Sequence, residues 1–203
     1  MNGVDHKQPR AADSVSMQAY AADHLAYIRR TMDRAGAFTA VSGRGQIGVG
    51  LIGMIAAWIS ARQTPGEWLA VWVVAAALAC VVAVAGIWMK ARALGTPLVS
   101  GPGRRFAFGF APPLVAGAVL TAVLVGQGAF DLLPGTWLLL FGAAVIAGGA
   151  LSVPPVPAMG GCFMVLGVTA LVAPAAWGTL LLAIGFGVLH IAFGIVITVK
   201  YGG

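Results

Sequence analysis

The stretch AWGTLLLAIGFGVLHIAFGIVITV, residues 176–199, decides the fold class of this protein. It is long enough to cross a bilayer, because about 20 apolar residues at 1.5 Å each cover the roughly 30 Å hydrocarbon core. Since small residues let membrane helices approach closely, we expect part of this stretch to pack against other helices. The small or polar residues that form one stripe at helical spacing are Ala183, Gly187, His190, Gly194 and Thr198.

His190 lies near the middle of this stretch. An ionisable residue at that depth is a functional candidate, so His190 could bind a haem, a pigment or a metal, or carry a proton. The other interpretation is a neutral imidazole that is hydrogen-bonded to a hydroxyl or carbonyl group on a neighbouring helix. One histidine supplies only one axial haem ligand, and the apolar runs hold no second histidine. The sequence therefore names a candidate cofactor-binding residue and no cofactor.

The composition of the chain is that of an integral membrane protein. Of its 203 residues 60% are hydrophobic and 9% are charged, with a mean hydropathy of +0.93, whereas soluble domains carry about a quarter charged residues. We predict an all-α bundle of six transmembrane helices within a membrane domain of residues 46–200. The predicted spans are residues 46–61, 67–89, 106–126, 134–151, 158–173 and 176–199.

The N-terminal part of the chain is polar and precedes the first span. Residues 1–13 are predicted to be flexible, and residues 14–41 have the periodicity of an amphipathic cytoplasmic or interfacial helix. Its polar face carries Arg29, Arg30 and Arg34, which suits an anionic lipid surface. Packing on the protein's own cytoplasmic face and binding to a protein partner are the two alternatives.

Positive charge indicates the orientation in the membrane. One set of flanks holds Arg62 together with Glu67 and Asp131, and the other set holds nine basic residues. The positive-inside rule then places both termini in the cytoplasm. The alanine- and glycine-rich composition suggests a bacterial plasma membrane, and the net charge of +6 follows topology, so we expect no nucleic-acid partner. The arginines expected to set topology or contact lipid headgroups are Arg29, Arg30, Arg34, Arg44, Arg104 and Arg105.

A Pro-x-x-Trp pattern recurs before the second, fourth and sixth spans, as Pro65–Trp68, Pro134–Trp137 and Pro174–Trp177. Proline suits the first turn of a helix, and tryptophan anchors a helix at headgroup level, so generic interface chemistry explains the pattern. The alternative is a fold of three hairpin repeats, as in some transporters. Mitochondrial carriers are the obvious comparison, but their Pro-x-Asp/Glu-x-x-Lys/Arg signature is absent.

The residues needed for catalysis are missing from the predicted spans. No carboxylate lies mid-membrane, and no zinc-protease or nucleophile-elbow motif occurs. We therefore expect no enzymatic activity. The first functional hypothesis is a non-enzymatic accessory or scaffold subunit, or a sensor, which packs against other membrane proteins or forms a homo-oligomer. The second is a small-molecule transporter or channel, and the third is a cofactor-binding subunit that uses His190.

Overall fold

The computed structural model describes residues 20, 24, 25, 41–93, 95, 101–150 and 152–201. It divides the chain into two compact units, residues 1–37 and 38–203. The described residues of the first unit are Tyr20, His24 and Leu25, which are helical. The predicted flexible terminus (1–13) lies outside the described residues. Of the predicted amphipathic helix (14–41), the structure describes only these three residues and Val41, so Arg29, Arg30 and Arg34 lie outside the described residues as well.

Residues 38–203 are helical along most of their described length. The α-helices are α2 (Gly43–Ser60), α3 (Pro65–Ala93), α4 (Gly101–Gly126), α5 (Leu133–Gly149), α6 (Pro155–Val172), α7 (Gly178–Leu182) and α8 (His190–Tyr201). Short 3₁₀ turns precede α5 and α7, namely η1 (Phe130–Leu132) and η2 (Ala175–Trp177). A π-helical segment, η3 (Ala183–Leu189), joins α7 to α8, so that Ala175–Tyr201 is one continuous span.

The sequence sets the starts of several helices. The side chain of Ser42 accepts a hydrogen bond from the backbone N–H of Gly45 at 3.1 Å and caps α2. At the start of α3, the backbone N–H of Thr64 donates to the Glu67 carboxylate at 3.1 Å, which is one of the two bonds of a capping box. Helices α5 and α6 carry proline in their first turn, where no backbone N–H is needed.

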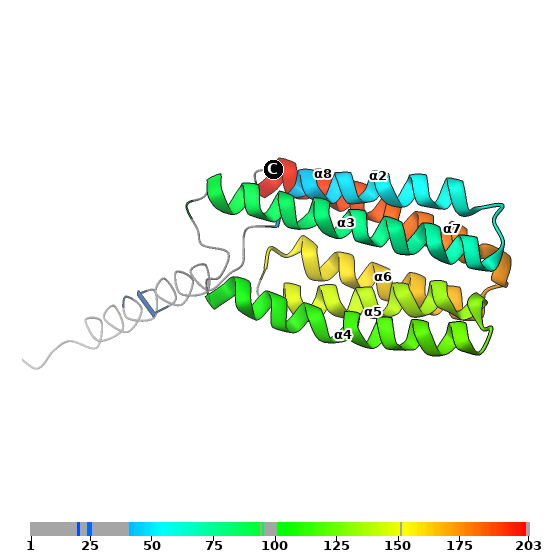
Figure 1. Cartoon of the computed structure of the whole chain (residues 1–203). Helices are drawn as coiled ribbons and strands as arrows, with labels where there is room; N and C mark the ends of the chain where they lie inside the picture. The colour runs from blue at the N-terminus through cyan, green and yellow to red at the C-terminus, as the bar shows by residue number, and fades with distance from the viewer. Residues whose placement is uncertain are drawn as a thin grey trace, which may run out of the picture. The chain divides into compact units, whose positions relative to one another are not determined.

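The helices of this unit form two groups of three (Figure 1). In one group α2 packs against α3 and against η3 and α8, and in the other α5 packs against α4 and α6. The last span therefore packs mainly on α2 and much less on α6, its neighbour in sequence. Three packed hairpins, the alternative drawn from the Pro-x-x-Trp pattern, do not describe this arrangement.

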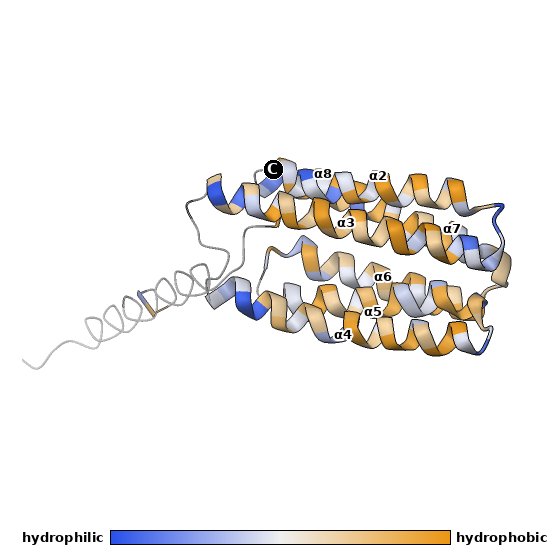
Figure 2. Cartoon of the chain, viewed as in Figure 1, coloured by the Kyte–Doolittle hydropathy of each residue, from blue (hydrophilic) through white to orange (hydrophobic). Residues whose placement is uncertain are grey.

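The prediction of an all-helical membrane bundle is confirmed. Within the described residues five segments are long and apolar enough to cross a membrane: Pro65–Ala93, Gly101–Gly126, Phe130–Gly149, Pro155–Val172 and Ala175–Tyr201. Figure 2 shows hydrophobic residues along most of their length. The other expected span is α2, whose 18 residues would extend roughly 27 Å and whose first turn includes Arg44. Its crossing of the membrane stays a prediction.

Helices α3 and α4 extend further than the apolar runs that predicted them. We expected a loop from Lys90 to Arg105, but α3 continues to Ala93 and α4 begins at Gly101. Basic side chains near a helix C-terminus interact favourably with the helix dipole, which accounts for the added turn of α3. Pro102 lies in the first turn of α4, where proline is well tolerated. A hydropathy pattern predicts neither the basic last turn of α3 nor the proline-containing first turn of α4.

Glycines bring the central helices of both groups into close contact. A Cβ atom on Gly194 of α8 would lie 2.8 Å from the carbonyl oxygen of Gly43 in α2, and one on Gly160 of α6 would lie 2.8 Å from that of Gly142 in α5. The contacting glycines recur at seven-residue spacing, which is close to two helical turns and keeps them on one face. They are Gly43 and Gly50, Gly187 and Gly194, Gly135 and Gly142, and Gly160 and Gly167.

We predict that Gly160→Ala lowers the free energy of unfolding by about 1–3 kcal/mol, because the added methyl group overpacks the contact with α5. The matched control is Gly161→Ala in the next position of α6, where a Cβ atom would meet nothing within 4 Å. Unfolding in mixed detergent micelles, followed by circular dichroism, measures both. Equal stability of the two variants would contradict the close α5–α6 contact.

Candidate functional site

His190 is the first residue of α8 and directly follows the π-helical segment. Its side chain is 2% exposed, and Nδ1 lies 3.3 Å from the carbonyl oxygen of Gly185. Since a carbonyl can only accept a hydrogen bond, this contact places the proton on Nδ1. The partner is therefore in the same helical span, whereas the sequence suggested a neighbouring helix. No pattern in the sequence indicated the π-helical turn, a feature frequent at functional sites.

Three phenylalanine rings surround the imidazole of His190. Ring centroids lie 5.2 Å away for Phe163 of α6, 5.4 Å for Phe141 of α5 and 6.0 Å for Phe186 of η3. The histidine thus lies where the two groups of helices meet. A planar cofactor could reach the ring only if these side chains separated, so the site as packed does not fit a haem. Within the described part of the chain, no three His, Cys, Asp or Glu side chains gather as a metal site.

The helix-packing candidates of the last span lie in two environments. Gly187 and Gly194 face α2, where their missing side chains leave room for Met54, Ile47 and the backbone of Gly43. Ala183 begins the π-helical segment and is partly buried against the hydrophobic core. The structure therefore places the two glycines in one helix contact and Ala183 against the hydrophobic core.

Two of the three Pro-x-x-Trp tryptophans lie against each other. The rings of Trp68 and Trp137 stack with centroids 5.4 Å apart and planes 11° apart. Trp68 Nε1 donates a hydrogen bond to Thr179 Oγ1 at 2.9 Å, and Trp137 Nε1 donates to Thr121 Oγ1 at 2.8 Å. These contacts link α3, α5, α7 and α4, so both groups of helices are joined here. Trp177, the third expected anchor, is 53% exposed.

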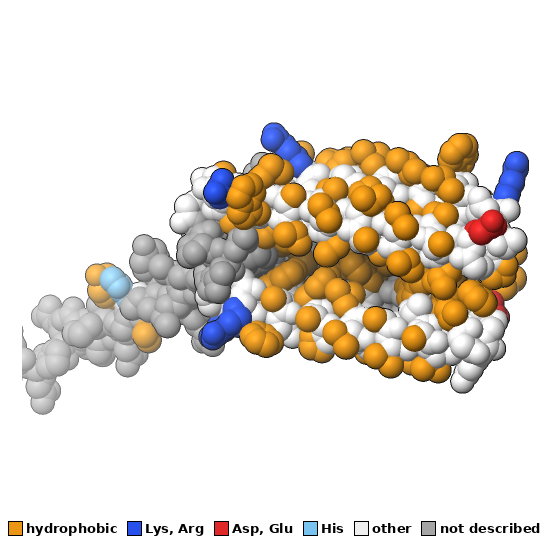
Figure 3. All heavy atoms as spheres, in the orientation of Figure 1, with side chains coloured by type: hydrophobic (Ala, Val, Ile, Leu, Met, Phe, Trp, Pro, Cys, Tyr) orange, Lys and Arg blue, Asp and Glu red, His pale blue; other side chains and the backbone are white. Residues whose placement is uncertain are grey.

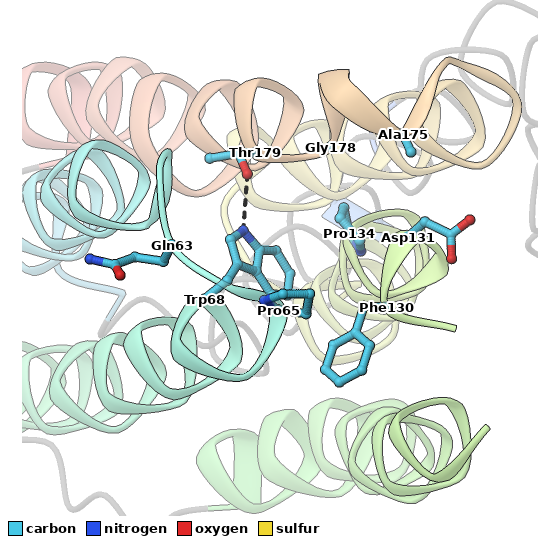
Figure 4. A pocket seen from close by; sticks show the side chains of 9 residues that line it. All are labelled: Gln63, Pro65, Trp68, Phe130, Asp131, Pro134, Ala175, Gly178 and Thr179. Atoms are coloured by element: carbon cyan, nitrogen blue, oxygen red, sulfur yellow. Dashed lines mark hydrogen bonds between the residues drawn. The ribbon is translucent and has the colours of Figure 1, made fainter. Parts of the chain in front are cut away.

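A small cavity of about 200 Å³ opens beside this tryptophan stack. All three Pro-x-x-Trp regions contribute to its walls, among them Pro65, Trp68, Pro134, Gly178 and Thr179 (Figure 4). Figure 4 shows the Asp131 carboxylate and the Gln63 amide directed away from the space between Trp68 and Pro134. Ligand pockets usually measure about 300–1,000 Å³ and have converging polar groups, which this cavity lacks. The cavity therefore offers little to a ligand.

Charged side chains separate to the two ends of the helices (Figure 3). Among the described residues, one end, hereafter the basic end, carries Arg44, Lys90, Arg92, Arg104, Arg105 and Lys200, and the opposite end carries Arg62, Glu67 and Asp131. Lys90 Nζ donates hydrogen bonds to the carbonyl oxygens of Val41 at 3.0 Å and Tyr201 at 3.4 Å. This lysine ties the start of α2 to the end of α8, and the three arginines Arg44, Arg104 and Arg105 are exposed.

We predict that His190→Ala lowers the free energy of unfolding by about 2–5 kcal/mol, because it leaves a cavity among the three phenyl rings. His190→Phe should cost less, since a ring of similar size fills the space and only the bond to Gly185 is lost. Unfolding in mixed micelles measures both variants. If both are equally unstable, packing is not the main contribution of this side chain.

We predict that Trp68→Phe lowers the free energy of unfolding by about 1–2 kcal/mol, because it removes the hydrogen bond to Thr179 and part of the stacking on Trp137. Trp58→Phe serves as the control, since Trp58 is 82% exposed and substitutions at such sites usually change stability by less than about 0.5 kcal/mol. Circular dichroism follows unfolding without relying on tryptophan fluorescence. A loss as large in Trp58→Phe would contradict a specific role for the stack.

The chain was compared with known protein families, curated proteins and solved structures. None of these comparisons finds a match for it. The physical features described above therefore carry the functional argument, and they establish a polytopic membrane protein built of apolar helices.

Proposed function

We propose that this protein has no enzymatic activity and acts as an accessory or scaffold subunit, or as a sensor, by packing against another membrane protein. Helix α4 carries the proposal. It is apolar enough to span a membrane, yet none of its residues is buried, whereas its neighbour α5 buries residues along its whole length. A surface of this kind is available to a partner helix.

The exposed side of α4 has the composition of a helix-packing surface. Ala107 and Ala111, and again Ala118 and Ala122, are exposed and four residues apart. Pairs of small residues at this spacing allow the backbones of two membrane helices to approach closely. The glycine contacts within the bundle already use the same device, and α4 carries it on a side that no described helix covers.

The absence of enzymatic activity is supported by the roles of the described polar residues. Ser42 caps α2, and Ser60 accepts a hydrogen bond from Trp72 Nε1 at 3.1 Å. The carboxylates of the described residues, Glu67 and Asp131, are exposed at the same end of the bundle. No nucleophile and base therefore meet in this part of the chain, as general acid–base or covalent catalysis would require.

Transport is the second candidate, favoured by a recess between α3 and α4 in Figure 3. Its visible floor is hydrophobic, which does not suit the passage of a polar solute. A polar route through the bundle would need Cys80, Thr121, Thr169 and His190 around one cavity. Thr121 instead accepts a hydrogen bond from Trp137, and Thr169 is partly buried and donates to the Val165 carbonyl. Cys80 is exposed and His190 is enclosed. This arrangement favours the packing function.

We further propose that the protein lies in a bacterial plasma membrane with the basic end in the cytoplasm. The support is the separation of charge, since positively charged flanks are retained on the cytoplasmic side. Both termini would then be cytoplasmic, and the loop that contains Arg62 would face outward.

The orientation predicts which residues a membrane-impermeant maleimide can reach in intact cells. With Cys80 and Cys162 replaced by serine, Gln63→Cys should react in intact cells, and Arg44→Cys should react only after the membrane is opened. Gel-shift labelling measures both. The reverse pattern would place the basic end outside.

The packing function predicts the products of photo-crosslinking. A photoreactive amino acid at Val115 or Val119 of α4, which are 62% and 59% exposed, should give a protein adduct in native membranes. The control is Val172 of α6, which is 80% exposed and should give mainly lipid adducts. Mass spectrometry of the mild-detergent extract identifies the partner. Lipid adducts alone from α4 would contradict the proposal, and an adduct of two copies of this chain would assign the surface to homo-oligomerisation.

A further inference from the structure

An apolar groove lies on the surface between α2 and α3. Its volume is about 410 Å³, and it follows α2 from Ile52 to Ile59, roughly 10 Å at 1.5 Å per residue. The small side chains of Ala56 and Ala75 are buried at its base, at 3% and 7% exposure. Larger side chains rise on both sides, with Ile55 on α2 and Leu78 on α3 more than half exposed.

The shape of this groove suits a hydrocarbon chain better than a protein helix. Helices α2 and α3 pack directly against each other, so the space between them is a shallow channel rather than a gap. A helix with its side chains is about 10–12 Å wide, so its backbone would lie over such a channel rather than within it. A single acyl chain can lie along the alanine base, with the branched side chains on either side of it.

A positive charge stands near one end of the groove. Arg62 lies in the turn that joins α2 to α3, three residues after Ile59, and its side chain is exposed. The nearby Glu67 carboxylate accepts hydrogen bonds from the backbone N–H of Thr64 at 3.1 Å and from its hydroxyl at 2.7 Å. No ion pair joins Arg62 to Glu67. The guanidinium is therefore available to an anion at the level where the hydrocarbon region ends.

We propose that the α2–α3 groove binds one acyl chain of an anionic phospholipid of the surrounding bilayer, with the lipid phosphate held by Arg62. The proposal stands apart from the function assigned to α4, because it concerns another face of the bundle. Guanidinium groups bind phosphate oxygens through paired hydrogen bonds. Trp58, exposed one turn before Arg62, lies where tryptophan side chains contact the headgroup region.

The test is native mass spectrometry of the full-length protein titrated with phosphatidylglycerol or phosphatidylcholine in mild detergent. Phosphatidylglycerol should bind more tightly. Arg62→Gln should weaken its binding about fivefold and leave phosphatidylcholine binding unchanged, and Arg62→Lys should keep most of the preference. Added salt should weaken phosphatidylglycerol binding to the wild type and not to Arg62→Gln.

A second pair of variants tests the groove itself. Ala70 lines the groove at its rim, so Ala70→Leu should obstruct it and reduce the binding of both lipids. Ala76→Leu makes the same change at an exposed position of α3 that does not line the groove and should bind like the wild type. Equal lipid binding by these two variants, or an unchanged lipid preference in Arg62→Gln, would overturn the proposal. A dimer that Ala70→Leu abolishes would also overturn it, because the groove would then bind a second copy.

Discussion

In hydrocarbon, helices gain no hydrophobic free energy by approaching one another, so close van der Waals contact has to hold this bundle together. The chain meets that constraint with glycine, which has no side chain, at the positions where helices touch. Glycines seven residues apart bring α2 against α8 and α5 against α6, close enough that a methyl group would collide with the opposite backbone. Each pair is antiparallel, and each forms the centre of one three-helix group. The large number of glycines in the chain follows from this geometry.

The two groups are joined by aromatic side chains. Near the middle, Phe141, Phe163 and Phe186 enclose His190, and at one end Trp68 stacks on Trp137. Aromatic rings suit this role because they bury a large area and their edges and faces attract. The tryptophan Nε1 atoms at this joint donate hydrogen bonds to Thr121 and Thr179. These hydrogen bonds account for the polar side chains at this joint, within an otherwise apolar interior, without assigning chemistry to them.

The sequence predicts the helices well because hydropathy reports directly on which segments can lie in a membrane. The sequence predicts poorly which of these helices pack against each other. The three Pro-x-x-Trp patterns predict membrane anchors or hairpin repeats, yet Trp68 and Trp137 contact each other, since α3 and α5 begin at the same end of the bundle. The small and polar residues around His190 have helical spacing, which predicts that they share a face. Spacing does not predict that Gly194 packs against α2 while His190 packs against α5 and α6. Nor does a hydropathy pattern reveal a π-helical turn.

That π-helical turn, Ala183–Leu189, has a consequence for relatives of this chain. One residue added to or removed from an α-helix rotates everything beyond it by about 100°. A relative one residue shorter in this segment could keep a continuous span while turning His190 away from the phenylalanines, or turning Gly194 away from α2. Insertions and deletions are usually tolerated in loops and excluded from spans. Here the span itself contains a place where a change of length would exchange one helix neighbour for another.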